Sequence, residues 1–161
     1  MSESISIRPA APHEAGIILQ FIRDLATYEH LEHEVVATEE LLREALFGRR
    51  PYAEVVFGCL QGEPVGFALF FHNFSTFLGR PGIYLEDLFV RPEARGSGVG
   101  RRLLAWLAAT AVSRGCGRLE WAVLNWNEPS IQFYRKLGAV AMEEWGIYRV
   151  TGPALTRLAA D

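Results

Sequence analysis

The chain has 161 residues, half of them hydrophobic and 22% charged, which is the composition of an ordinary globular protein with a single domain over residues 1–161. The net charge of -3 does not provide the basic surface by which proteins bind nucleic acid. The two cysteines, Cys59 and Cys116, make neither a disulfide framework nor a zinc pattern, so we expect both to be buried and inert. The four histidines lack metal-ligand spacing, so no metal is expected.

The N-terminal residues 1–6 contain no basic region and no long apolar core, so the sequence does not predict a signal peptide. No apolar run approaches the length that spans a bilayer. We therefore expect a soluble, cytoplasmic protein with no membrane partner and no nucleic-acid partner.

Hydrophobic periodicity predicts helices and strands in a mixed order along the chain. Amphipathic spacing indicates helices over 13–29, 39–47, about 100–114 and 127–137. Runs rich in β-branched and aromatic residues predict strands over 5–8, 53–60, 65–71, 83–90, 119–124, 139–144 and 147–150. This order predicts an α/β (α+β) protein, in which a mixed sheet of six to seven strands has helices on both faces.

A glycine-rich loop follows the strand over 83–90 and opens the third helix. It contains Gly96, Gly98 and Gly100 between Arg95 and Arg101. Unpaired N–H groups and the helix dipole at such a position hold phosphate or pyrophosphate. The loop lacks the lysine of a P-loop, and its G-x-G-x-G spacing differs from the dinucleotide fingerprint. An R-x-x-G-x-G signature of coenzyme A-dependent N-acetyltransferases fits, and a flexible turn without a ligand is the alternative.

Three segments in sequence order carry a family resemblance. They are the run Tyr84-Leu85-Glu86-Asp87-Leu88-Phe89-Val90, the 95–100 loop, and the run Asn125-Trp126-Asn127-Glu128-Pro129-Ser130-Ile131-Gln132-Phe133-Tyr134. With them, the sequence resembles the GNAT N-acetyltransferase superfamily and within it the diamine (spermidine/spermine-type) acetyltransferases. The resemblance covers nearly the whole chain. It departs at the hairpin after Leu60 and around 142–146.

The resemblance implies acetyl-coenzyme A as the cofactor and the GNAT fold. The pantetheine arm would pair with the backbone of Leu88, Phe89 and Val90, as a strand does. The pyrophosphate would lie against the loop residues Arg95, Gly96, Ser97, Gly98, Val99, Gly100 and Arg101. Further contacts would come from Asn127, Glu128, Pro129, Ser130 and Tyr134. Asn127 is also a candidate helix cap, and either role fits the residue type.

Two side chains are predicted to move protons. Glu86 is a carboxylate in an otherwise apolar run, and a carboxylate can accept the proton of an amine substrate directly or through water. The resemblance implies that Tyr134 donates a proton to the leaving thiolate, although a core aromatic at this spacing is the plainer interpretation. Tyr28, Glu29, Glu86 and Asp87 are the predicted acceptor-binding residues. Acids attract a cation, and the pair Tyr28-Glu29 is part of the resemblance to the diamine acetyltransferases. Glu32 and Glu34, in the same acidic stretch, are interpreted as a solvated loop.

The most specific function that the sequence supports is acetyl transfer to a polyamine, a diamine or a lysine-like amine. An amino acid, a drug or a protein amine is an alternative acceptor, because acceptor pockets lie in variable loops. A non-catalytic module that binds acyl-coenzyme A is a second alternative. The resemblance also implies a homodimer.

Overall fold

The computed structural model describes residues 4–161, so the start of the N-terminal segment considered above lies outside the described residues. The chain forms two compact units, Met1–Ala122 and Val123–Asp161. Among the described residues, no helix is both long and apolar enough to cross a membrane.

The first unit is built on one sheet of five strands in the order β1-β2-β3-β4-β5. Neighbouring strands run antiparallel except β4 and β5, which are parallel. The predicted mixed sheet is therefore confirmed, although the predicted number of six to seven strands was too high. The strands are β1 (Ile5–Pro9), β2 (Glu54–Leu60), β3 (Glu63–Ser75), β4 (Arg80–Val90) and β5 (Leu119–Trp121).

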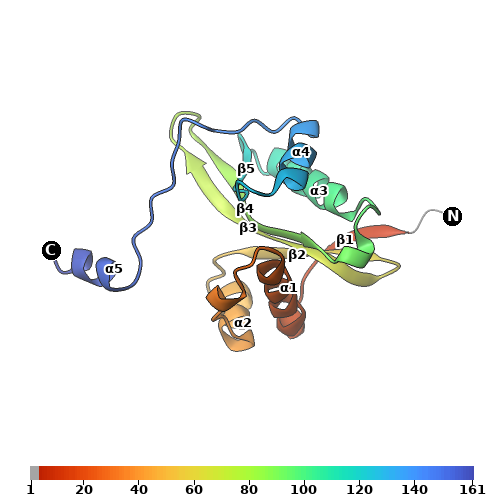
Figure 1. The fold of residues 1–161 in the computed structure, drawn as a ribbon, viewed down its shortest axis with the longest axis horizontal. Helices are drawn as coiled ribbons and strands as arrows, with labels where there is room; N and C mark the ends of the chain where they lie inside the picture. The colour runs from red at the N-terminus through yellow and green to blue at the C-terminus, as the bar shows by residue number, and fades with distance from the viewer. Residues whose placement is uncertain (1–3) are drawn as a thin grey trace. The chain divides into compact units, whose positions relative to one another are not determined.

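Helices cover both faces of this sheet, as predicted. Figure 1 shows α1 (Ala15–Tyr28) and α2 (Glu39–Phe47) on one face and α3 (Val99–Ser113) on the other. Short 3₁₀ turns at Pro12–Glu14, Glu32–Glu34 and Pro92–Ala94 connect these elements.

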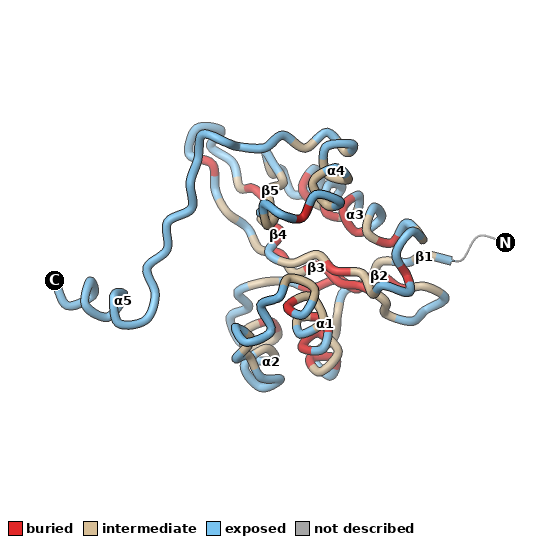
Figure 2. The backbone as a smooth tube through the Cα atoms, viewed as in Figure 1, coloured by how far each residue is buried: buried red, intermediate tan, exposed pale blue. Residues whose placement is uncertain are grey.

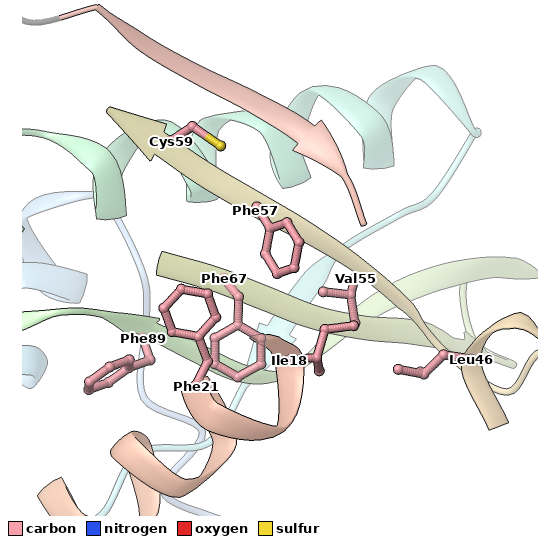
Figure 3. Packing of buried hydrophobic residues seen from close by; sticks show 8 residues of the cluster. All are labelled: Ile18, Phe21, Leu46, Val55, Phe57, Cys59, Phe67 and Phe89. Carbon is pink, nitrogen blue, oxygen red and sulfur yellow. The ribbon is translucent and has the colours of Figure 1, made fainter. Parts of the chain in front are cut away.

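The face under α1 holds an aromatic core. The ring of Phe21 stacks on Phe67 at 5.4 Å between centroids and lies tilted against Phe57 at 5.9 Å and Phe89 at 6.5 Å. Figure 3 shows these rings together with Ile18, and Figure 2 shows that the central strands are the buried part of the sheet. Phe89 is thereby fixed under α1, which sets the position of the end of β4.

On the opposite face of the sheet, β2 requires a glycine at the position where the start of α3 packs against it. A Cβ atom on Gly58 would lie 2.5 Å from Cγ1 of Val99 and 3.3 Å from Leu103. The missing side chain therefore lets the first turn of α3 lie directly against β2. Leu103 and Leu107, one turn and two turns further on, are fully buried on this face.

The second unit differs from the sequence-based expectation at its C-terminal end. It contains α4 (Glu128–Lys136) and α5 (Gly152–Ala159). Residues 139–144 and 147–150, predicted as strands, form no strand in the described chain. Alternating apolar residues become a strand only where a neighbouring strand satisfies their backbone groups, and none pairs with them here. Helix α5, which begins beside Pro153, was not predicted.

The two cysteines are free thiols. Cys59 is buried, as expected, whereas Cys116 is only half-buried, so the expectation of burial was wrong for it. The burial of Cys59 raises the pKa of its thiol, which favours the inert, protonated form.

Candidate active site

Strand β4 carries a bulge at its two acidic residues. In the ladder with β3, Leu69 lies opposite Asp87 while its neighbour Phe70 lies opposite Leu85, so the register shifts by one residue. Glu86 is the extra residue of this bulge. Successive side chains of a regular strand point to opposite faces, but a bulge redirects them. The shift explains why Glu86 and Asp87 both line one cleft.

One edge of β4 is unpaired beyond this bulge. The parallel strand β5 pairs with Ile83, Tyr84 and Leu85 only. Leu88, Phe89 and Val90 pair with β3 on their other side. Within the described residues, no strand of the sheet covers the β5 side of 86–90. An extended ligand can therefore approach this side, which is the role predicted for Leu88, Phe89 and Val90. The carbonyl of Val90 already accepts the Nε–H of Arg95 at 3.0 Å.

The glycine loop leads directly into α3. Gly98 is the N-cap of this helix with φ +97°, and Gly96 also has a positive φ of +82°. No side chain of the described chain caps the helix. The first-turn N–H groups of Val99, Gly100 and Arg101 therefore remain for an external acceptor. A Cβ atom at Gly96 would meet nothing within 4 Å, so the loop surface is open to a ligand.

An acidic cleft of ≈ 420 Å³ lies beside the bulge on the α1 face. Four carboxylates, Glu29, Glu34, Glu86 and Asp87, share it with an apolar wall. The wall consists of Ile22, Leu25, Ala26, Leu31, Val35, Val36 and Ala37. No lysine, arginine or histidine lines this cleft among the described residues, so its chemistry suits a cation with an aliphatic chain.

Burial and crowding change the acidity of this cleft. The half-buried carboxyl of Asp87 has its pKa raised to about 7, first by burial and then by the charges of Glu86 and Glu29. Burial also raises the pKa of Glu29. The attraction of a cationic ligand would offset the repulsion among these carboxylates and favour their charged forms.

A second cleft of ≈ 550 Å³ lies on the other side of the end of α1. We call it the arginine cleft, and its lining residues are Asp24, Thr27, Tyr28, Phe89, Arg91, Pro92, Glu93 and Arg95. Tyr28 lines this cleft, whereas the adjacent Glu29 lines the acidic cleft. The structure thus separates two neighbours that the sequence had suggested for one acceptor site.

Sequence reasoning also missed part of the acidic cleft. Glu34 is exposed, as its interpretation as a solvated residue implied, and its carboxylate lies 3.5 Å from Nε2 of His33. It also lines the cleft, while Glu32 does not. The apolar residues 35–37 were not assigned any role, although they contribute to the cleft wall. The sequence signal for them was the acidic 32–34 segment followed directly by apolar residues. Because this loop has no periodicity, the sequence does not indicate toward which surface its acidic or apolar side chains point.

The remaining predicted residues belong to the second unit. The side-chain oxygen of Asn127 accepts the backbone N–H of Ser130 at 3.4 Å at the start of α4, so its capping role is confirmed. Asn127 is 6% exposed. Glu128 and Pro129 open the helix, and Tyr134 lies half-buried in its last turn beside the ring of Phe133 at 5.7 Å.

A family model described as the acetyltransferase (GNAT) family matches residues 19–139. The chain belongs to this family. It is 39% identical to a thialysine N-epsilon-acetyltransferase of Bos taurus, over 96% of this chain and 97% of that protein. It is 30% identical to a human spermidine/spermine N(1)-acetyltransferase-like protein, over 95% of this chain and 23% of that protein. An integron cassette protein from V. cholerae has the same fold, with a TM-score of 0.81 and 27% identity over 100% and 99% of the two chains.

Membership of the GNAT family makes this protein an acetyl-coenzyme A-dependent enzyme. The residues present fit that cofactor, because β4 offers an unpaired edge and α3 offers uncapped first-turn N–H groups behind a glycine loop. A Cβ atom at Gly98 would have Cδ1 of Ile5, at 3.6 Å, as its nearest neighbour. The backbone at Gly98 is therefore open to the approach of an anion.

The raised pKa of Asp87 predicts a pH-dependent stability. Its pKa is about 7 in the folded protein and near 3.8 in a free chain, so the folded state keeps a proton that the unfolded state has lost. The free energy of unfolding should therefore fall as the pH rises from about 4 to about 7. In Asp87→Asn this fall should be smaller. Urea denaturation at pH 5 and pH 8 measures it, with the exposed Asp161→Asn as control; an equal mutational effect at both pH values contradicts the prediction.

Proposed function

We propose that this enzyme transfers the acetyl group of acetyl-coenzyme A to the primary amine of a small cationic acceptor, such as a polyamine, a diamine or a lysine-like amine. The observation that carries this proposal is the acidic cleft, which four carboxylates line and which no lysine, arginine or histidine of the described residues lines. The names of the bovine and human relatives, which refer to thialysine and spermidine/spermine, support the same class.

The cofactor supplies an activated acetyl thioester, and the chain supplies its binding groups. The backbone of Leu88, Phe89 and Val90 would bind the pantetheine arm along the unpaired edge. The 95–101 loop would bind the pyrophosphate through the N–H groups of α3. Asn127, Glu128, Pro129 and Ser130 are proposed as further cofactor contacts, in addition to the cap that Asn127 provides.

The acidic residues of β4 would prepare the amine for attack. An acceptor amine carries a proton at neutral pH, and only the deprotonated amine is a nucleophile. Glu86, which is exposed at the bulge, would accept this proton directly or through water. Asp87 and Glu29, both with raised pKa, would bind the positive charge of the acceptor deeper in the cleft. The amine then attacks the thioester directly, with both substrates bound at once.

Thiol release with a panel of amines tests the proposed function. We expect turnover with spermidine, L-ornithine or thialysine, and little with a neutral or an anionic amine, because carboxylates are the charged groups that line the cleft in the described chain. Turnover confined to neutral or anionic acceptors would contradict the proposed acceptor class and indicate another amino acid, drug or protein amine as the substrate. Binding of acetyl-coenzyme A without thiol release from any amine would instead identify a non-catalytic module.

The conformation of Gly98 makes it a probe of the cofactor site. An aspartate there would put a negative charge next to the proposed pyrophosphate position, at a φ of +97° that disfavours side chains. Asparagine has the same shape without the charge and tolerates this region better. We expect Gly98→Asp to weaken acetyl-coenzyme A binding roughly tenfold or more beyond the effect of Gly98→Asn. Calorimetry on folded variants measures both, and equal affinities would refute the assignment.

Tyr134 is proposed as the proton donor to the leaving thiolate of coenzyme A. A phenol stays protonated at neutral pH because its reference pKa is about 10, and the thiolate that leaves belongs to a thiol with a reference pKa of about 8.5. Tyr134→Phe keeps the ring and removes only the hydroxyl. Turnover at saturating acetyl-coenzyme A should fall by about 10²–10⁴-fold, with cofactor affinity far less changed. A loss of less than about threefold would show that Tyr134 is a packing residue.

We further propose that both units form one acetyltransferase domain that works as a homodimer in the cytoplasm. The family match over 19–139 crosses the division between the units. Apolar side chains of the segment after α4, including Trp145, Ile147 and Tyr148, are exposed by 76%, 77% and 97%, and a second copy would remove such surface from water. Sedimentation should give a dimer at working concentration, and a monomer would contradict this.

A further inference from the structure

Arg95 is exposed, but three contacts hold its side chain in place. Its Nε donates to the backbone carbonyl of Val90 at 3.0 Å. Its guanidinium lies 4.9 Å from the ring centroid of Tyr28 and 5.5 Å from that of Phe89. The two rings come from different elements, the last residue of α1 and the penultimate residue of β4. These contacts fix the direction of a long side chain that would otherwise sample many rotamers.

The charge of Arg95 is not neutralised by these contacts. Aromatic faces attract a cation through their quadrupole, but they carry no net charge. Asp24 and Glu93 line the same cleft, yet neither forms an ion pair with Arg95 among the described residues. Arg95 is thus oriented and still carries its full charge, which is the condition for a guanidinium to bind a phosphate.

The position of Tyr28 differs from that of the acidic residues beside it. Its ring lies in the arginine cleft and under Arg95, while the Glu29 side chain lines the acidic cleft. The α1 terminus therefore contributes to both clefts, one residue to each. The ring of Tyr28 is placed to support Arg95 at the start of the glycine loop, and not among the carboxylates that suit an amine.

We propose that Tyr28 is a positioning residue for the cofactor: its ring holds Arg95 in the direction in which the guanidinium binds a phosphate of coenzyme A. This inference rests on the proposed function and assigns to Tyr28 a role in cofactor binding instead of acceptor binding. It also makes the end of α1 part of the cofactor site, although the phosphate-binding helix α3 lies on the opposite face of the sheet.

Variants at Tyr28 test the proposal by calorimetry with acetyl-coenzyme A. Tyr28→Leu removes the aromatic face, and we expect about two- to fivefold weaker binding, as for a cation–π contact near the surface. Tyr28→Phe keeps the face and should bind as the wild type does. Tyr52→Leu, at a residue that is 72% exposed and lines neither cleft, is the matched control. If Tyr28→Leu does not fold, Tyr28→Met removes the ring while retaining an apolar chain.

A double-mutant cycle shows whether the effect passes through Arg95. In the Arg95→Gln background, Tyr28→Leu should have no further effect on cofactor affinity. An unchanged affinity of Tyr28→Leu, an equal loss in Tyr28→Phe, or an equal loss without Arg95 would each overturn the proposal. A higher acceptor KM with unchanged cofactor affinity would assign Tyr28 to the acceptor. Failure of the wild-type protein to bind acetyl-coenzyme A would refute the proposed function itself.

Discussion

The shift in register between β3 and β4 is the constraint on which the site depends. Backbone pairing along β4 is continuous with β3 on one side, except at Glu86, where one extra residue is accommodated. This single insertion brings two consecutive carboxylates to the same cleft. Without it, strand alternation would put Glu86 and Asp87 on opposite faces and move every later residue of β4 to the other side. Phe89 would then no longer pack under α1.

The packing of α1 on this strand divides the surface into two chemically different clefts. Phe21 of α1 and Phe89 of β4 meet in the aromatic core, which holds the helix end near the end of the strand. On one side of this contact lie carboxylates with raised pKa, and on the other lie two arginines over aromatic rings. An amine and an anionic cofactor have opposite charge, so such a division would direct each to its own place.

Close approach of backbones accounts for the geometry of the proposed pyrophosphate site. Gly58 allows the start of α3 to lie against β2, and Gly98 leaves the first turn of the helix without a capping side chain. The burial of Leu103 and Leu107 holds the helix in this position. The position of α3 against the sheet thus serves two purposes. It buries the apolar residues of the core, and it leaves the first-turn N–H groups of α3 accessible.

The sequence by itself determined most of the local elements and the family. The spacing of apolar residues located α1, α2, α3 and the first five strands, because amphipathic periodicity is a property of the chain alone. The glycine loop and the runs around Glu86 and Tyr134 indicated the family correctly, since short-range chemistry is written in consecutive residues.

Only the tertiary structure decided which residues share a surface. The bulge at Glu86 is a mismatch between two strands, and neither strand carries it alone. The separation of Tyr28 from Glu29 depends on how α1 ends against β4, and the inclusion of Glu34 depends on where its loop lies. The predicted strands over 139–144 and 147–150 failed for the same reason. Strand formation and site membership both require a partner distant in sequence, which periodicity does not supply.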